Sequence, residues 1–112
     1  MDDISTVEVF QIQAEFCKSL ADPKRLMIIH ELYNGERSVN DLSVMLGANQ
    51  SNTSQHLAVL RKAGVVMTRR EGSNVYYSLV SQKIADACDL VRQVISNHLQ
   101  RNQILAEDLR NI

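Results

Sequence analysis

The sequence has few cysteines and no long apolar run. Its two cysteines, Cys17 and Cys88, lie far apart and neither belongs to a Cys-x-x-Cys pair. This excludes a disulfide framework and a zinc ribbon or finger, and it predicts free thiols. No apolar stretch approaches the roughly 18 residues that a membrane span needs, and Met1-Asp2-Asp3 is acidic where a secretory signal would be basic. We therefore expect a cytoplasmic protein with no membrane partner.

A strongly basic composition is also absent. The 112 residues carry a net charge of −1, whereas a nucleic-acid-binding domain is usually basic. The charge is nevertheless unevenly distributed, because no acidic residue lies between Gln50 and Arg70. Four cations fall in that stretch: Arg61, Lys62, Arg69 and Arg70. A local basic face on a mildly acidic protein is therefore expected.

The balance of residue types is that of an ordinary globular protein. Hydrophobic residues make up 45% of the chain and charged residues 22%, which is not the composition of a disordered tail. The length predicts one domain, residues 1–112. A domain this small buries only a modest share of its surface, so a second copy of the chain is expected to complete its core.

The first half of the chain predicts three helices. Residues 7–21 carry apolar side chains at helical spacing, namely Phe10, Ala14, Cys17 and Ala21. Asp22 and Pro23 form an N-cap followed by proline at the first helical position, and Gly35 stops this second helix. A short third helix begins after Ser38 and ends at Gly47, which can adopt a left-handed conformation.

The second half predicts a helix, a hairpin and a long last helix. Ser51 can cap a fourth helix that Gly64 closes. Two stretches rich in β-branched and aromatic residues, 65–70 and 75–79, flank turn residues and predict a β-hairpin. The range 81–110 contains neither proline nor glycine and predicts one helix. Its apolar stripe consists of Ile84, Cys88, Val91, Ile95 and His98.

The third and fourth helices, residues 38–63, together predict a helix-turn-helix whose second helix enters the major groove of DNA. The first turn of that helix is polar, and asparagine, glutamine, serine and threonine can hydrogen-bond base edges or phosphates. The expected reading edge is Ser51, Asn52, Thr53, Ser54, Gln55 and His56, followed by the cations Arg61 and Lys62. The alternative is a solvated helix start, because capping favours the same residue types.

The hairpin, residues 65–79, has the composition of a wing. Arg69 and Arg70 can neutralise phosphates or enter the minor groove, and the small polar residues Ser73 and Asn74 suit its tip. The alternative is a solvated charged hairpin. Together with the preceding helices, it predicts a mainly α fold with a small β-hairpin, a winged helix-turn-helix of about five helices.

In this order, the segments resemble the ArsR/SmtB family of winged-helix repressors over nearly the whole chain. The resemblance is carried by residues 16–26 (FCKSLADPKRL), 38–42 (SVNDL), 51–57 (SNTSQHL), 60–66 (LRKAGVV), 69–72 (RREG) and 75–79 (VYYSL). It implies a homodimer held by its first and last helices, residues 1–21 and 81–110. It also implies that this dimer represses transcription at an inverted-repeat operator in double-stranded DNA and is released by an inducer, which the sequence does not identify.

The metal motifs of that family are absent. Its sensors with a site on the third helix carry Cys-Val-Cys-Asp where this chain has Ser38-Val39-Asn40-Asp41. Sensors with a site on the last helix use an Asp-x-His pair, a later histidine and an acid. The matching positions here are Ser81, Lys83, His98 and Arg101. Zinc needs about four nitrogen, oxygen or sulfur ligands, so we expect no metal and no cofactor.

The role of the two cysteines has three interpretations. Cys17 and Cys88 lie on apolar stripes, where a free cysteine usually packs as a small hydrophobe. The alternative is a thiol switch, although the family's dithiol sensors use positions that read His30 and Ser96 here. A metal site formed by Cys88 and His98 across two subunits is a third reading, which needs further ligands.

Two other classes of function compete with a DNA-binding regulator. An enzyme would need Cys17 as a nucleophile activated by His30, but the sequence has no phosphate or oxyanion loop and the thiolate would be disfavoured on an apolar stripe. A winged helix used as a protein-protein adaptor would favour a neutral or acidic fourth helix and wing. The basic stretch up to Arg70 favours DNA.

Overall fold

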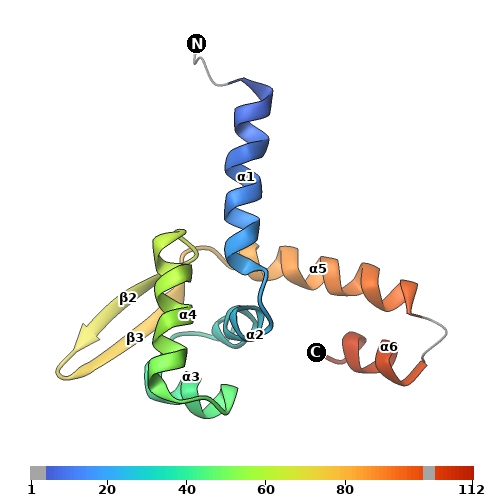
Figure 1. Ribbon diagram of the computed structural model, residues 1–112. Coiled ribbons are helices and arrows are strands. Elements are labelled where there is room, and N and C mark those ends of the chain that lie inside the picture. Colours follow the sequence, from blue (N-terminus) through green and yellow to red (C-terminus); the bar gives the residue numbers. More distant parts are fainter. Residues whose placement is uncertain (1–4, 100–102) are drawn as a thin grey trace. The chain divides into compact units, whose positions relative to one another are not determined.

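The computed structural model describes residues 5–99 and 103–112 and divides the chain into two compact units, Met1–Val80 and Ser81–Ile112. The elements of the first unit are α1 (Thr6–Leu20), α2 (Pro23–Leu32), β1 (Arg37–Ser38), α3 (Val39–Leu46), α4 (Gln50–Lys62), β2 (Val66–Glu71) and β3 (Asn74–Leu79) (Figure 1). The second unit contains α5 (Gln82–His98) and α6 (Gln103–Arg110).

The predicted helix boundaries at Asp22, Ser38 and Gly47 are confirmed. The carboxylate of Asp22 accepts hydrogen bonds from the backbone N–H groups of Lys24 (2.9 Å) and Arg25 (3.2 Å). The Ser38 hydroxyl caps α3, and Gly47 ends it with φ +63°, a left-handed conformation that glycine adopts at low cost. These local signals fix where two of the helices begin and one ends.

The N-cap of α4 is Asn49, so the prediction of Ser51 at this position was wrong. The Asn49 side chain accepts from the backbone N–H of Asn52 at 2.7 Å, and Ser51 lies inside the helix. Asparagine and serine cap helices equally well. The short turn after Gly47 decides between them, because it places Asn49 at the helix start.

A small apolar core holds α2, α3 and α4 together. Each of these helices contributes side chains that are at most 1% exposed, and Val65 continues the core after α4. The fully buried set is Ile28, Ile29, Leu32, Leu42, Leu57, Leu60 and Val65. Burying one such side chain contributes roughly 1.5–3 kcal/mol, so this core holds α3 and α4 in a fixed arrangement.

The predicted hairpin is present, and a short third strand extends it. Strands β2 and β3 pair antiparallel from Val66↔Leu79 to Glu71↔Asn74. Strand β1 adds on the other side of β3, with Arg37 opposite Tyr77, which gives the order β1-β3-β2. The sequence did not predict β1, because a two-residue strand has no periodicity of its own.

The last predicted helix, 81–110, is divided, so the prediction of one continuous helix was wrong. Helix α5 ends at His98, and α6 begins at Gln103 and packs against α5. The fold-back brings Arg110 to Ser96, whose buried hydroxyl accepts from Nη1 of Arg110 at 3.2 Å. Residues 100–102 lie outside the described residues. Over the part of the chain that the structure describes, no helix is long and apolar enough to cross a membrane.

Candidate nucleic-acid interface

The site is built on α3, the turn of residues 47–49, and α4. The two helices pack against each other, and their first turns are also joined by a side-chain hydrogen bond from Nε2 of Gln50 to Oδ1 of Asn40 (3.2 Å). Figure 1 shows α4 crossing beside α3, with the β2–β3 hairpin following directly in the chain. This is the order and packing of a helix-turn-helix followed by a wing.

One face of α4 is exposed and mostly polar. Its exposed residues Ser51, Ser54, Gln55 and Ala58 follow the i, i+3, i+4, i+7 spacing of one helix face. The opposite face holds the buried side chains Leu57 and Leu60. The packing therefore leaves a strip of hydroxyl and amide groups, with no large apolar side chain, pointing away from the core.

Thr53 is not part of this exposed face, which corrects the expectation for the reading edge. It is fully buried, and its Oγ1 donates to the backbone carbonyl oxygen of Asn49 at 3.0 Å. Thr53 lies two residues after Ser51 and one residue before Ser54, so it turns to another side of the helix. The sequence did not reveal that Thr53 is buried, because residues 51–56 are all polar and equally suited to solvent.

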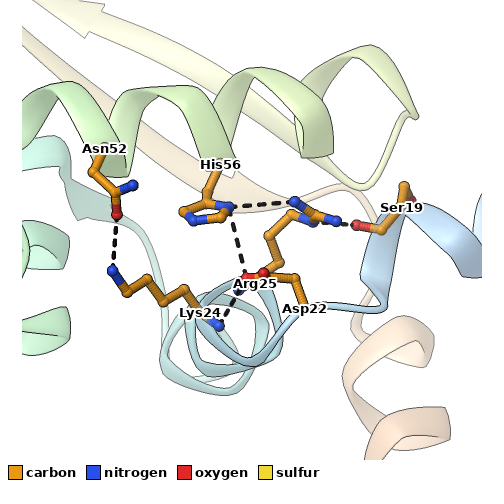
Figure 2. Close-up of polar contacts among 6 residues, drawn as sticks. All are labelled: Ser19, Asp22, Lys24, Arg25, Asn52 and His56. Carbon is orange, nitrogen blue, oxygen red and sulfur yellow. Dashed lines mark hydrogen bonds and ion pairs between the residues drawn. The ribbon is translucent and has the colours of Figure 1, made fainter.

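Asn52 and His56 are held by side chains of α2 rather than freely exposed (Figure 2). The Lys24 ammonium donates to Oδ1 of Asn52 at 3.0 Å. Arg25 donates from Nη1 to Nδ1 of His56 at 3.3 Å, and the Asp22 carboxylate lies 3.7 Å from the same nitrogen. Sequence reasoning missed Lys24 and Arg25, since nothing local links the start of α2 to α4.

This cluster changes the acidity of Asp22. Partial burial raises the pKa of its carboxyl, but the backbone N–H groups of Arg25 and Lys24, together with the nearby His56 and Arg25 side chains, outweigh that effect. The resulting pKa lies below the usual value. Asp22 is thus an anion that both caps α2 and faces His56 on α4.

In the wing, Arg69 is already paired. Its Nη2 and Nε atoms bind the two carboxylate oxygens of Glu36 at 2.6 and 3.2 Å, and its guanidinium lies 4.8 Å from the Tyr76 ring centroid. Oε2 of Glu71 lies 3.6 Å from Nη1 of Arg69. The hydrogen bond to Arg69 lowers the pKa of Glu36, and the same contact raises the pKa of Arg69.

Other predicted DNA-contacting residues are exposed and available. Arg70, Ser73 and Asn74 are exposed on the hairpin, and Arg61 and Lys62 are exposed at the end of α4. No hydrogen bond or ion pair ties the side chain of Arg70, Arg61 or Lys62 to another described residue. The structure thus separates a paired wing arginine, Arg69, from three cations whose charges are not neutralised by a neighbour.

The helices outside the helix-turn-helix carry exposed apolar side chains. Helix α1 buries none of its residues, and Phe10 is 62% exposed. On α5, the exposed apolar side chains are Leu90, Val91, Val94 and Ile95. The sequence stripe included Val91 and Ile95 but missed Leu90 and Val94, which lie beside them on the helix.

The positions that match the family's metal-sensing motifs cap helices here or lack neighbouring metal ligands. Ser38 and Ser81 cap α3 and α5, and Arg101 lies outside the described residues. Within residues 5–99 and 103–112, no group of three histidine, cysteine or acidic side chains is close enough to hold a metal ion. Cys17 is exposed and Cys88 is partly exposed.

Comparison with known proteins identifies the family. The family described as "Bacterial regulatory protein, arsR family" matches residues 22–68. The HTH-type transcriptional regulator Rv0081 of Mycobacterium tuberculosis is 41% identical over 103 residues, which cover 91% of this chain and 90% of that protein. The chain belongs to the arsR family. The transcriptional repressor SmtB homolog of Synechocystis is 36% identical over 89% of this regulator and 73% of its own length.

Solved structures agree with the fold of the arsR regulator. The crystal structure of Rv0081 matches with a TM-score of 0.75 at 39% identity, covering 84% of this chain and 95% of that one. The homodimeric winged helix-turn-helix DNA-binding domain Mb0332 of Mycobacterium bovis matches with a TM-score of 0.76 at 32% identity. The match covers 90% of this chain and 95% of that one. The predicted winged helix-turn-helix is confirmed, and the protein is a transcriptional regulator.

Proposed function

We propose that this arsR-family protein is a homodimeric repressor that binds an inverted-repeat operator through α4 and is released from it by an inducer or a redox signal. The observation that carries the proposal is the exposed face of α4. Ser51, Ser54 and Gln55 lie there at the spacing of one helix face. Glutamine can bind adenine through two hydrogen bonds, and serine can contact bases or phosphates.

Around this edge, other residues supply affinity without sequence information. Arg61, Lys62 and Arg70 are exposed cations with no partner among the described residues, and contacts to phosphates release counterions. Ser73 and Asn74 at the hairpin tip are small enough to approach the DNA backbone. Lys24 and Asn52 join this set, because their hydrogen bond lies at the N-terminal end of α4.

The proposed dimer explains the apolar surfaces that one copy leaves exposed. Val91 is 59% and Phe10 62% exposed, and large apolar side chains gathered on one helix face usually meet a partner. We assign α1, α5 and α6 to the dimer seam. A relative of known structure is described as a homodimeric domain. A two-fold axis then sets the two α4 helices about one DNA turn apart, roughly 34–36 Å.

We further propose that the inducer is not a metal ion of the kind that the family's metal sensors bind. The positions of both metal motifs hold Ser38, Asn40, Ser81 and Lys83, and none of these supplies a good zinc ligand. Neither Cys17 nor Cys88 forms a disulfide, and the two thiols are our candidates for a thiol switch.

Titration of duplex DNA tests the proposal directly. A fragment from upstream of the protein's own gene and a shuffled fragment are titrated at several salt concentrations and followed by fluorescence anisotropy. We expect tighter binding to the upstream fragment, two chains per site, and a steep loss of affinity with salt. Arg70→Ala should weaken binding to both fragments alike. Equal affinity for the two fragments, or an affinity independent of salt, contradicts the proposal.

A further inference from the structure

A pocket of about 580 Å³ lies between the C-terminal halves of α1 and α4, beside the first turn of α2. Its apolar lining consists of Ile12, Phe16, Val59 and Ala63. Ile12 is 63% exposed and Val59 is 40% exposed. The walls of the pocket are therefore apolar but open to solvent, and all of them belong to the first compact unit.

The rim of this pocket is positively charged. Lys18, Arg25 and Lys62 lie in the lining with one acid, Glu15, which leaves an excess of two positive charges (three cations against one carboxylate). Neither lysine is paired with a carboxylate among the described residues. Small-molecule sites typically combine apolar walls with a few polar groups that fix orientation, and cations on the rim select an anionic head group.

The proposed dimer seam leaves this pocket accessible. At about 100° per residue, the α1 stripe of Phe10, Ala14 and Cys17 lies on one side of the helix. Ile12 and Ser19, which line the pocket, lie on the opposite side. A second copy that packs on the stripe therefore does not need to cover the pocket.

One rim residue connects the pocket to the recognition helix. Arg25 donates from Nε to the backbone carbonyl oxygen of Ser19 at 2.7 Å, and from Nη1 to His56 on α4 at 3.3 Å (Figure 2). The guanidinium thus joins the end of α1 to α4. A carboxylate bound in the pocket would compete with His56 for this guanidinium and would alter how α4 is held.

We propose that this pocket binds a small carboxylate with a hydrocarbon tail, and that its binding lowers operator affinity by drawing Arg25 away from His56. The tail would lie against Phe16 and Val59, and the carboxylate would meet Lys18 and Arg25. This inference rests on the proposed function for its effect on DNA, but the binding step itself does not.

Binding is tested on the full chain without DNA, with octanoate as the probe. Calorimetry should give one saturable site per chain, and NMR should show shifts of the Ile12 and Val59 methyl groups. Octan-1-ol, which has the same chain length without the charge, should bind about tenfold more weakly, because it lacks the charged hydrogen bonds. Acetate, which has the charge without the tail, should not bind.

Matched variants locate the site. Lys18→Met keeps the aliphatic stem, removes the charge and should weaken octanoate binding about tenfold. Lys83→Met makes the same change at an exposed position on α5 and should leave binding unchanged. Equal binding of octanoate and octan-1-ol, an absence of shifts at Ile12 and Val59, or dissociation of the dimer by octanoate would each overturn the proposal. The last outcome would make the pocket a subunit seam.

The effect on DNA is measured separately. Saturating octanoate should lower the operator affinity of the wild type by on the order of tenfold, within the usual range of allosteric coupling, and should have a much smaller effect on Lys18→Met at the same concentration. If octanoate binds and operator affinity stays constant, the coupling through Arg25 is wrong. Operator binding without octanoate tests the proposed function on its own, so the two failures are distinguishable.

Discussion

Arg69 of the wing and Glu36, which precedes β1, form a two-point ion pair with distances of 2.6 and 3.2 Å. The carboxylate fixes the guanidinium against the hairpin and cancels its charge locally. Arg69 and Arg70 are neighbours in the sequence, but only Arg70 presents an uncompensated charge. The two wing arginines therefore do not contribute equally to DNA binding in our account.

Glu36→Gln should free the charge of Arg69 and strengthen binding to any duplex. The slope of log affinity against log salt should steepen by up to about 0.9, the contribution of one additional phosphate contact. Asp86→Asn, at an exposed position on α5, makes the same change in net charge away from the wing and serves as the control. An unchanged slope for Glu36→Gln would mean that Arg69 stays away from the DNA even when it is released.

Substitutions of Gln55 and Thr53 should separate the recognition of DNA sequence from the stability of the fold. Gln55→Ala should cost on the order of 1–3 kcal/mol at a matched operator and little on random DNA. Thr53→Val, which keeps the shape of a buried side chain but loses its bond to Asn49, should lower the free energy of unfolding by about 1 kcal/mol and leave discrimination intact. Competition binding and denaturant titration measure the two effects. The assignment of the exposed face fails if Thr53→Val relaxes specificity and Gln55→Ala does not.

Asp22 should make stability depend on pH in a defined direction. Its pKa is lowered in the folded state, so its stabilisation is fully present above its unfolded pKa, about 3.9, and is lost as pH falls through the folded value. Asp22→Ala should cost about 1 kcal/mol of unfolding free energy at neutral pH, as loss of an N-cap usually does, and progressively less below about pH 4. Asp22→Asn keeps a capping side chain that does not titrate, and is the control. A cost of Asp22→Ala that stays constant down to low pH would contradict this role.

Val91 tests the dimer seam. Val91→Asp places a carboxylate on the exposed apolar face of α5, where the dimer would bury it unpaired at a cost of several kcal/mol. Sedimentation at micromolar concentration should show a wild-type dimer and a largely monomeric variant with weak operator binding. Gln93→Glu adds the same charge on the other side of the helix and should remain dimeric. A monomeric wild type, or a dimeric variant with unchanged operator affinity, would show that α5 is not the seam.

Local chemistry in the sequence was enough to predict most of the first unit. Asp22 and Pro23 mark the start of α2, and Ser38 and Gly47 bound α3. The side chains of Asp22 and Ser38 accept hydrogen bonds from backbone N–H groups at the helix start, and the backbone of Gly47 ends its helix. The hairpin followed from two β-rich stretches around a turn at Gly72. These features depend on neighbours within four residues, so a single sequence contains them.

Features that depend on distant partners were missed or misassigned. The burial of Thr53, the hydrogen bond of Lys24 to Asn52, and the pairing of Arg69 with Glu36 all require knowledge of which elements pack together. The end of α5 at His98 is a similar case, since no proline or glycine marks it. Sequence periodicity therefore located helix α4 but not which of its polar residues face outward.

The most direct test of the central claim is selection of DNA from a random duplex library by the full chain, followed by footprinting of the enriched sequences. We predict a pseudo-palindrome whose half-sites lie about one helical turn apart, roughly 10–10.5 base pairs, each protected in the major groove, with two chains bound. Gln55→Ala should enrich a more degenerate half-site. Enrichment of no sequence, or of a single unrepeated site bound by one chain, would contradict a dimeric repressor that reads its operator through α4.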